Sequence, residues 1–376
     1  MARKKKIRIL ISAWAGTRNT GDNAIFMGEV RAIRKYVPKA EITAFTQNID
    51  NYIIDKLSIR SVSNRFSNLL QIINEIISCD IFILGGGGLI QEKTSIFTIF
   101  HHCYKTILAG LYKKKIIAYS LGIEKIKSKF NKIILSLAFK NAKIIMVRDK
   151  KSKKNLLDIN KDLEGKIKVT ADCALNLFSG KKQNKSSSKI GICVRDWFIY
   201  NKYLTVNISR KISTIIKQDK HNCFIKKMTH CIQKLIEEGY SINLIPFEGV
   251  RDEEAIQKIA LNLKGPYKVI KWHSDPRIMC KIISEMDLIV GMRLHSLVLG
   301  AAMEKKLISI NYSEKVKSFM DSLGLYDNQF SLLFQSEKFI KKIEIEIMKK
   351  SIDYKAKLSE LRCRERENIM LLKKNI

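Results

Sequence analysis

Two side chains suited to holding negative charge and moving protons stand two residues apart in the segment 291–302, GMRLHSLVLGAA. The apolar run 287–290 predicts a buried strand, and the small and apolar residues 296–303 favour a helix. In extended geometry Arg293 and His295 would project to the same side of the chain. A permanent cation would then lie beside a titratable imidazole at the carboxyl end of a strand, where open α/β sheets bind ligands. Taken singly, such residues are usually surface or structural groups, but the pair in this context predicts a site for an anionic ligand.

Two further arginines follow apolar runs in the same way. Arg148 comes directly after IIMV, and Arg195 comes directly after IGICV. Together with Arg293 they place three cations at the ends of three predicted strands. One such arginine carries little information, whereas three indicate a shared anion-binding edge.

The segment 16–25, GTRNTGDNAI, joins the first predicted strand to its helix. Asn19, Asp22 and Asn23 place capping side chains next to the free N–H groups of a helix start. Asp22 has two interpretations: it is the N-cap residue, or it is a base or hydroxyl-orienting carboxylate. The G-x-G-x-x-G spacing of a dinucleotide site is absent.

Four glycines begin the segment 85–91, GGGGLIQ, directly after the predicted strand DIFIL. Close packing of a helix on a strand explains such a run about as well as a ligand does. In the functional interpretation the backbone around Gly86 and Gly87, with the dipole of the following helix, cradles a phosphate or carboxylate, and Gln91 lies beside it.

Strand-like and helix-like segments alternate along the chain, which predicts an α/β fold of parallel, doubly wound sheets. A polar stretch near the middle, SGKKQNKSSSK, reads as a linker, after which the alternation restarts. We expect two Rossmann-like halves with a cleft between them, and segment 196–222 has no clear period and is expected to be an insertion or lid. The expected division is an N-terminal domain 1–180, a linker 181–189, a C-terminal domain 190–335 that carries the donor site, and a helical segment 336–376 that packs back.

The 376 residues carry a formal charge of +33, from 69 Lys+Arg against 36 Asp+Glu. A lysine-biased genome explains this excess as well as selection for a partner does. The functional alternative is attraction to anionic substrates or to an anionic membrane surface. Nucleic acid is not expected as a partner, because no arginine-rich block, zinc-finger spacing or RNP-like aromatic motif accompanies the charge.

The eight cysteines show no C-x-x-C pair, and several lie within apolar runs. We therefore expect a reducing, cytoplasmic environment and no structural zinc. The longest apolar runs fall short of the ~18 residues that a membrane span needs, and the basic start MARKKKIRILISAW reads as a first strand. The protein is expected to be soluble or peripherally attached to the inner face of the membrane, and its oligomeric state stays open.

Taken together, these motifs resemble the polysaccharide pyruvyl transferase family. The matches follow the family's order over roughly residues 7–325, and the most specific are GMRLHS, GGGGLIQ and the stretch that contains Tyr312 and Lys315. The resemblance implies a GT-B-like pair of Rossmann domains. It also implies that Arg148, Arg293, His295 and Lys315 form the donor site, and that Asp22 faces the acceptor.

The implied reaction transfers a pyruvyl group from phosphoenolpyruvate to a sugar of an exopolysaccharide or cell-wall glycan precursor, and forms a pyruvate ketal. The expected acceptor is a glycan or a lipid-linked sugar. His295 is expected as acid and Asp22 as base, although the sequence leaves open which of the two protonates carbon. Phosphoenolpyruvate is a co-substrate, and no metal or other cofactor is expected. The alternatives are a GT-B glycosyltransferase with a nucleotide-sugar donor and a non-catalytic module that binds polyanions or membranes.

Overall fold

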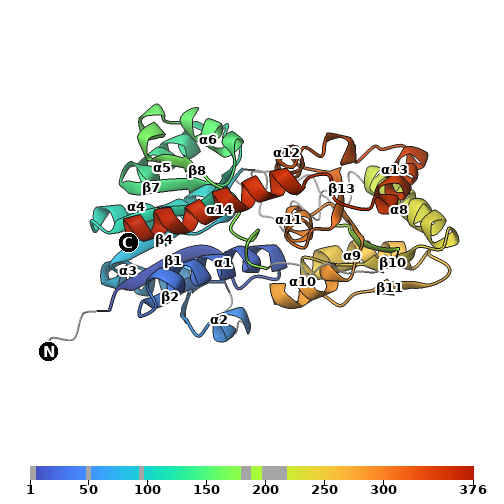
Figure 1. Cartoon of the computed structure of the whole chain (residues 1–376). Helices are drawn as coiled ribbons and strands as arrows, with labels where there is room; N and C mark the ends of the chain where they lie inside the picture. The colour runs from blue at the N-terminus through green and yellow to red at the C-terminus, as the bar shows by residue number, and fades with distance from the viewer. Residues whose placement is uncertain (1–5, 48–51, 93–96, 179–187, 197–217) are drawn as a thin grey trace.

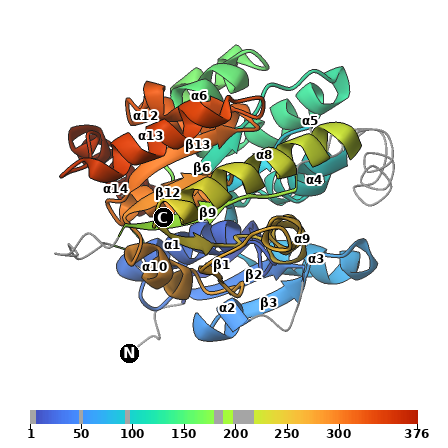
Figure 2. The same cartoon turned by 90° about the vertical axis from the view of Figure 1, so that its right-hand side faces the viewer.

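The computed structural model describes residues 6–47, 52–92, 97–178, 188–196 and 218–376 (Figure 1). They form two parallel β-sheets, each covered by helices on both faces, and the two sheets lie side by side (Figures 1 and 2). The alternation of strands and helices thus gives the parallel α/β fold that the sequence predicts.

The N-terminal sheet has the strand order β3-β2-β1-β4-β6-β7-β8, and β5 pairs with the end of β6. Alternate residues of each strand point to opposite faces, so Ile9 and Ile11 pack under α1 while Leu10 packs under α3 and α4. Both faces are buried, which explains the continuous apolar runs. The elements are β1 (Arg8–Ala15), α1 (Thr20–Tyr36), β2 (Glu41–Thr46), α2 (Tyr52–Lys56), β3 (Arg60–Ser63), α3 (Leu69–Ser78), β4 (Ile81–Leu84), β5 (Gly87–Ile90), α4 (Phe97–Leu111), β6 (Lys115–Ile123), α5 (Lys129–Lys140), β7 (Ala142–Val147), α6 (Lys150–Leu157) and β8 (Ile167–Val169).

The C-terminal sheet has the order β11-β10-β9-β12-β13-β14. Helices α10 and α11 pack on one face, and α8, α9 and α13 pack on the other. Its elements are β9 (Lys189–Cys193), α8 (Gln218–Glu237), β10 (Ser241–Leu244), α9 (Gly249–Ala260), β11 (Tyr267–Val269), α10 (Pro276–Ser284), β12 (Leu288–Gly291), α11 (Leu294–Ala302), β13 (Lys306–Asn311), α12 (Glu314–Ser322), β14 (Gln329–Ser331), α13 (Ser336–Met348) and α14 (Lys355–Asn375).

The two sheets share one apolar core, because the cluster around α1 continues without a break into α10 and α11. Backbone hydrogen bonds also join them: Thr20 N donates to the Phe247 carbonyl at 2.9 Å, and Gly249 N donates to the Arg18 carbonyl at 3.0 Å. The start of α1 is therefore held against the loop that follows β10. This contact brings the carboxyl ends of β1 and β10 together.

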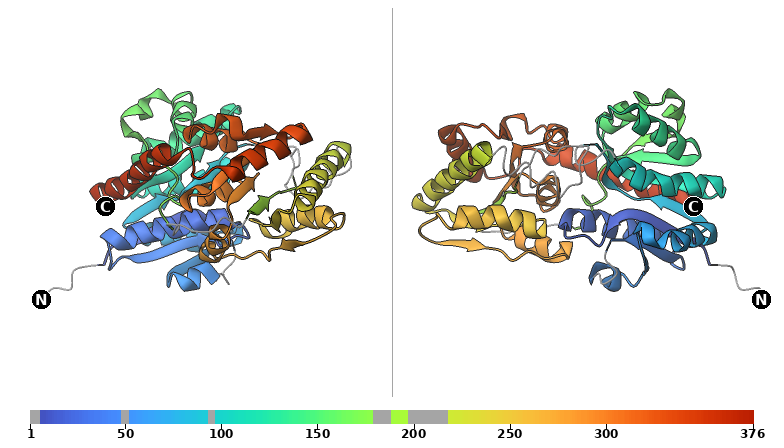
Figure 3. Two further views of the ribbon diagram at one scale, coloured as in Figure 1. Left: turned by 45° about the vertical axis from the view of Figure 1, so that its right-hand side comes forward. Right: turned by 180° about the vertical axis from the view of Figure 1, so that it is seen from behind.

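Helix α14 follows the C-terminal sheet in sequence but lies across the N-terminal one (Figures 1 and 3). Leu358, Leu361 and Leu372 pack into the shared core. Asn368 Nδ2 donates to the Ala171 carbonyl at 2.8 Å, and Lys115 Nζ donates to the Ile376 carbonyl at 3.0 Å. The last helix thus completes the covering of the first sheet. Among the described helices none is both long and apolar enough to span a membrane.

Some local features differ from the sequence prediction. The short strand β3 was not predicted, because its RSVS sequence is polar and only four residues long. Helix α1 begins at Thr20 and so includes Asp22, which the prediction placed in the turn before it. Strand β5, not a helix, follows the first glycines of the 85–88 run. The domain boundaries stay a prediction, and most of the expected linker and of the expected lid lies outside the described residues.

Candidate functional site

Helix α1 begins where the two sheets meet. Asn19 is its N-cap, with the side-chain oxygen accepting from Gly21 N at 3.0 Å. Asn23 Nδ2 donates to the Thr17 carbonyl at 3.2 Å and to the Ser274 carbonyl at 3.0 Å, so it ties the helix to the loop before α10. Both asparagines therefore hold the start of α1 in place. The N-cap residue is Asn19 and not Asp22.

Because Asn19 provides the cap, the carboxylate of Asp22 is left to interact across the domain boundary. Burial raises the pKa of Asp22 to about 6, against the opposing effect of His295 and Lys315, which stabilise its charged form. The carboxylate also lies close to Gly87, where a β-carbon would come within 3.9 Å of Oδ1. Asp22 can thus exchange a proton near neutral pH, as a general base must.

His295 lies in the first turn of α11 and faces the start of α1. A β-carbon on Gly21 would lie only 2.1 Å from Nδ1 of His295, so the imidazole occupies the space that glycine leaves free. The other ring nitrogen, Nε2, lies 3.6 Å from Oδ2 of Asp172. It is buried and has no hydrogen-bond partner among the described residues. A buried polar atom left in this way is a common mark of a functional group.

Asp172 follows β8 and connects His295 to Arg148. Arg148 Nη1 donates to Asp172 Oδ2 at 3.2 Å. Burial alone would raise the pKa of Asp172, but His295, Arg148 and the backbone N–H of Ala174 outweigh it and lower the pKa to about 2. Asp172 is therefore negatively charged beside the imidazole, and that charge fixes the direction in which the ring lies.

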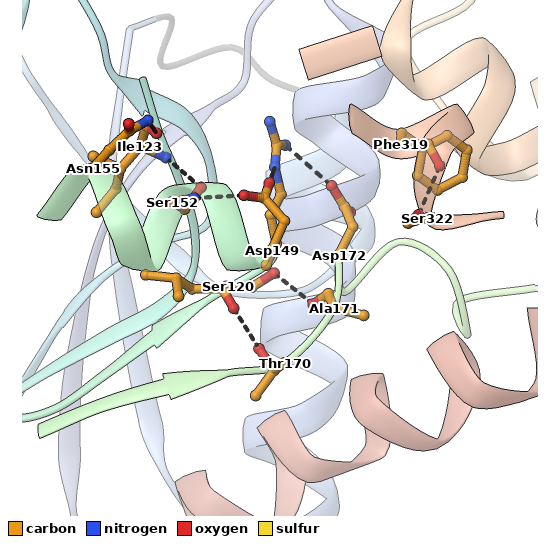
Figure 4. Close-up of polar contacts among 12 residues, drawn as sticks. Ser120, Ile123, Asp149, Ser152, Asn155, Thr170, Ala171, Asp172, Phe319 and Ser322 are labelled. Carbon is orange, nitrogen blue, oxygen red and sulfur yellow. Dashed lines mark hydrogen bonds and ion pairs between the residues drawn. The ribbon is translucent and has the colours of Figure 1, made fainter. Parts of the chain in front are cut away.

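The loop that carries Asp172 is held from two sides, by Ser120 (Figure 4) and by Asn368. Ser120 Oγ donates to the Ala171 carbonyl at 3.0 Å and accepts from Cys173 N at 3.2 Å. Asn368 of α14 donates to the same Ala171 carbonyl. Ser120 has φ of 50°, in the left-handed region that non-glycine residues seldom adopt. An uncommon backbone conformation thus places the hydroxyl between two peptide groups of the loop.

Arg293 is the N-cap residue of α11 and is surrounded by carboxylates. Its Nε and Nη2 donate to Asp252 at 2.6–3.1 Å, and Nη2 also contacts Glu248. Asp252 in turn accepts from the backbone N–H groups of Phe247 and Glu248, at 2.9 and 2.8 Å. Burial would lower the pKa of Arg293, but Asp252 and Glu248 raise it above its ordinary value. These contacts join α11 to the start of α9.

Tyr312, at the end of β13, lies among cations. Arg195 Nη1 donates to its hydroxyl oxygen at 3.0 Å, and the guanidinium lies over the ring, 4.8 Å from its centroid. Burial would raise the pKa of Tyr312, but Lys315, Arg195 and Arg293 outweigh it and lower the pKa to about 7. A partly ionised tyrosine therefore takes up some of the positive charge of this group.

Lys315, in the first turn of α12, approaches the glycine run from the opposite domain. A β-carbon on Gly88 would lie 3.8 Å from its Nζ. Within the parts of the chain that the structure describes, no carboxylate lies within ion-pair distance of this ammonium group. Lys315 is thus a cation at the domain boundary whose charge is available to an anion.

The glycine run has a packing role as well. Gly86 N donates to Glu29 Oε1 at 2.9 Å, and a β-carbon on Gly86 would lie 2.7 Å from Ile25. Gly87 has φ of 99°, which glycine adopts without strain. The run therefore lets β4 and β5 approach α1 closely, and the N–H of Gly86 is occupied by Glu29. Gln91 lies just beyond β5, partly buried.

The structure thus brings Asp22, His295 and Lys315 together, with Arg148 joined to them through Asp172. Arg195 instead contacts Tyr312. Arg293 is paired with the carboxylates of Asp252 and Glu248. Three residues that the prediction did not name are central: Asp172, Glu248 and Asp252. Asp172 and Glu248 lie three and four residues beyond the last residues of β8 (Val169) and β10 (Leu244), whereas Asp252 lies within α9, so a rule that selects residues directly after an apolar run finds none of the three.

Two parallel sheets that meet through helices α1, α10 and α11 and share one apolar core define a GT-B-type pair of Rossmann-like domains, and solved structures share this fold. The UDP-GlcNAc 2-epimerase of Methanocaldococcus jannaschii aligns with a TM-score of 0.64 at 14% identity, covering 98% of this chain and 99% of that one. MurG of Acinetobacter baumannii aligns with a TM-score of 0.52 at 10% identity, covering 98% and 99%. A glycosyltransferase of kitacinnamycin aligns with a TM-score of 0.56 at 8% identity, covering 99% and 100%. At these identities the similarity establishes the fold alone.

The sequence identifies the class of protein more narrowly than the fold does. Residues 19–314 match the sequence model of the polysaccharide pyruvyl transferase family, a range that includes Asp22, Asp172 and His295. The chain therefore belongs to the polysaccharide pyruvyl transferase family and is a transferase.

Proposed function

We propose that this protein transfers a pyruvyl group from phosphoenolpyruvate to two hydroxyls of a glycan or lipid-linked sugar and forms a pyruvate ketal. The observation that carries the proposal is the meeting of Asp22, His295 and Lys315 at the domain boundary, two from one domain and one from the other. Family membership directs the chemistry toward pyruvyl transfer. The buried Nε2 of His295, beside an ionised Asp172, supplies a proton donor.

The reaction is balanced without a metal or a redox partner. The methylene carbon of phosphoenolpyruvate gains a proton, one sugar hydroxyl attacks the adjacent carbon, phosphate leaves, and the second hydroxyl closes the ketal. Of the two hydroxyl protons released, one balances the proton added to the new methyl group and the other leaves with phosphate. His295 donates to carbon, and Asp22 removes a proton from the acceptor hydroxyl.

The cations divide between two roles in this proposal. Lys315 and Arg195 attract the phosphate and carboxylate of the donor. Lys315 has no ion pair with a carboxylate in the described part of the chain, and Arg195 donates there to a tyrosine hydroxyl and a backbone carbonyl. Arg293 positions α11, and thereby His295, through its contacts with Asp252. Arg148 positions Asp172.

Binding of phosphoenolpyruvate, measured by calorimetry, tests the proposal. Lys315→Ala should weaken binding by roughly tenfold or more, the effect of removing one charge-assisted contact. Lys317→Ala is the matched control, since Lys317 lies on the same helix but is exposed and pairs with Asp321 at 3.0 Å. Wild-type protein that binds UDP but not phosphoenolpyruvate, with or without sugar acceptors, would replace this proposal with glycosyl transfer.

A further inference from the structure

The outward face of helices α3, α4 and α5 exposes an unusual amount of apolar surface. Of the twenty exposed large hydrophobic side chains in the described residues, ten lie within 66–137. The three helices form one layer, because α4 contacts both α3 and α5 and all three bury their inner sides in the same core (Figure 3). We call their outward side chains the apolar face: Leu70, Ile77, Phe97, Leu111, Phe130, Ile133 and Leu137.

Helix α5 shows that this exposure follows a pattern. Phe130, Ile133 and Leu137 are 55%, 60% and 49% exposed. At 100° per residue they lie within an arc of about 60°, opposite the buried Leu135 and Phe139 side of the helix. A helix of a water-facing surface would carry polar residues along this arc. A contiguous apolar stripe of this kind marks a surface that another phase or molecule covers.

The charges around the apolar face select its occupant. The sequences of α4 and α5 contain no aspartate or glutamate, whereas exposed lysines stand at the ends of both helices and in the loop between β6 and α5. Apolar side chains that enter the boundary of a bilayer, with lysines beside the headgroups, are the composition of an interfacial membrane contact. The lysines are Lys113, Lys125, Lys127, Lys129 and Lys140.

We propose that the apolar face docks on the surface of an anionic lipid bilayer. Helix α4 connects two parallel strands and therefore begins at the carboxyl edge of the N-terminal sheet, the edge at which Asp22 lies. A bilayer docked on these helices would therefore extend to the edge of the sheet that carries Asp22. The consequence that a lipid-linked sugar enters from that bilayer rests on the proposed function, whereas docking itself does not.

Flotation with vesicles tests the proposal. Full-length protein should bind vesicles of mixed phosphatidylglycerol and phosphatidylcholine, bind phosphatidylcholine alone more weakly, and lose binding as salt rises. The variant Phe130→Ser/Ile133→Ser/Leu137→Ser should lower the partition coefficient by roughly tenfold or more. The control is Leu261→Ser/Leu333→Ser, which removes apolar residues that are 85% and 81% exposed in the C-terminal half, and it should bind as wild type does.

Equal binding by the α5 variant and the wild type, or no binding by the wild type, would overturn the proposal. Sedimentation analysis tests the other occupant of the apolar face. If the wild type is a dimer that does not bind vesicles, and the α5 variant is a monomer, the face belongs to the contact with a second copy of the chain. Calorimetry with phosphoenolpyruvate on the same proteins separates the two proposals. A protein that binds vesicles but not phosphoenolpyruvate would support docking and reject pyruvyl transfer. A protein that binds phosphoenolpyruvate but not vesicles would reject docking and leave pyruvyl transfer supported.

Discussion

Arg293 and His295 are separated by one residue, yet they belong to two very different environments. Arg293 is bound by Asp252 and Glu248, and those carboxylates are themselves bound by backbone N–H groups and by Arg251. His295 has a buried nitrogen with no hydrogen-bond partner in the described chain, and it faces a carboxylate of the other domain. One group has its charges paired, and the other leaves polar atoms available.

The difference separates positioning from chemistry within a single motif. A fully paired buried cation stabilises one arrangement of the backbone, and removing it leaves its partners without compensation. An imidazole with an open nitrogen adds little to folding but can transfer a proton. We therefore expect substitutions at the two positions to affect different measurements.

The largest effect is expected for Arg293→Ala. It leaves Asp252 buried without its cation, so the free energy of unfolding should fall by about 3–5 kcal/mol, measured by urea denaturation. Arg251→Ala is the control, because Arg251 makes only a partly exposed pair with Glu248 and should cost less than about 1 kcal/mol. A stable Arg293→Ala protein that fails to bind phosphoenolpyruvate would instead assign this arginine to the donor, as the sequence predicts.

His295→Gln should reverse this pattern. It should lower kcat for ketal formation by about 10²–10⁴-fold and leave the urea midpoint close to that of wild type. His230→Gln, at an exposed position of α8, should change neither quantity.

Gly21→Ala tests the position of the His295 ring while leaving its chemical structure unchanged. The added methyl group would displace the His295 ring, so kcat should fall by roughly 10²-fold. Gly165→Ala, where a β-carbon meets nothing within 4 Å, is its control. Retained activity in Gly21→Ala would show that the position of the ring does not matter for the reaction.

The last expected effect is the pH dependence that Asp22 confers. With a pKa raised to about 6, Asp22 is an active base above that pH, and kcat/KM should fall as the pH drops below it. The folded state holds this proton more tightly than the unfolded state. The free energy of unfolding should therefore fall as the pH rises from about 4 to about 6, and it should stay lower above that pH. Asp22→Asn should therefore be inactive and slightly more stable at pH 8. An unchanged pH profile in a still-active Asp22→Asn protein would exclude Asp22 as the base.

The sequence was sufficient to predict the fold, and it singled out residues such as Asp22 and His295 that the structure places at the domain boundary. The strand-end rule located Arg148, Arg195, Arg293 and His295, because the position of a residue after an apolar run is a local property. The helix-capping argument applied to Asp22 gave two interpretations, and only the structure shows that Asn19 is the cap.

The sequence did not reveal which charged side chains contact each other. Asp172 and His295 are far apart in the chain, and nothing near either of them specifies the other. Whether Arg293 is available to a ligand or bound to Asp252 depends on how α9 and α11 approach each other, which is a property of packing. The functions of the charged residues therefore separate only when their partners are known.

Helix α14 has a consequence for the order in which the chain acquires its structure. Its leucines fill the core beneath α1, and Asn368 holds the loop of Asp172, yet α14 is synthesised after every residue of the site. The first sheet is therefore left with an uncovered apolar surface throughout translation, until residues beyond 355 emerge from the ribosome. The loop of Asp172 is consequently fixed only after the other residues of the site have been made, and a polypeptide that ends before α14 would contain Asp22, His295 and Lys315 but not the helix that holds this loop.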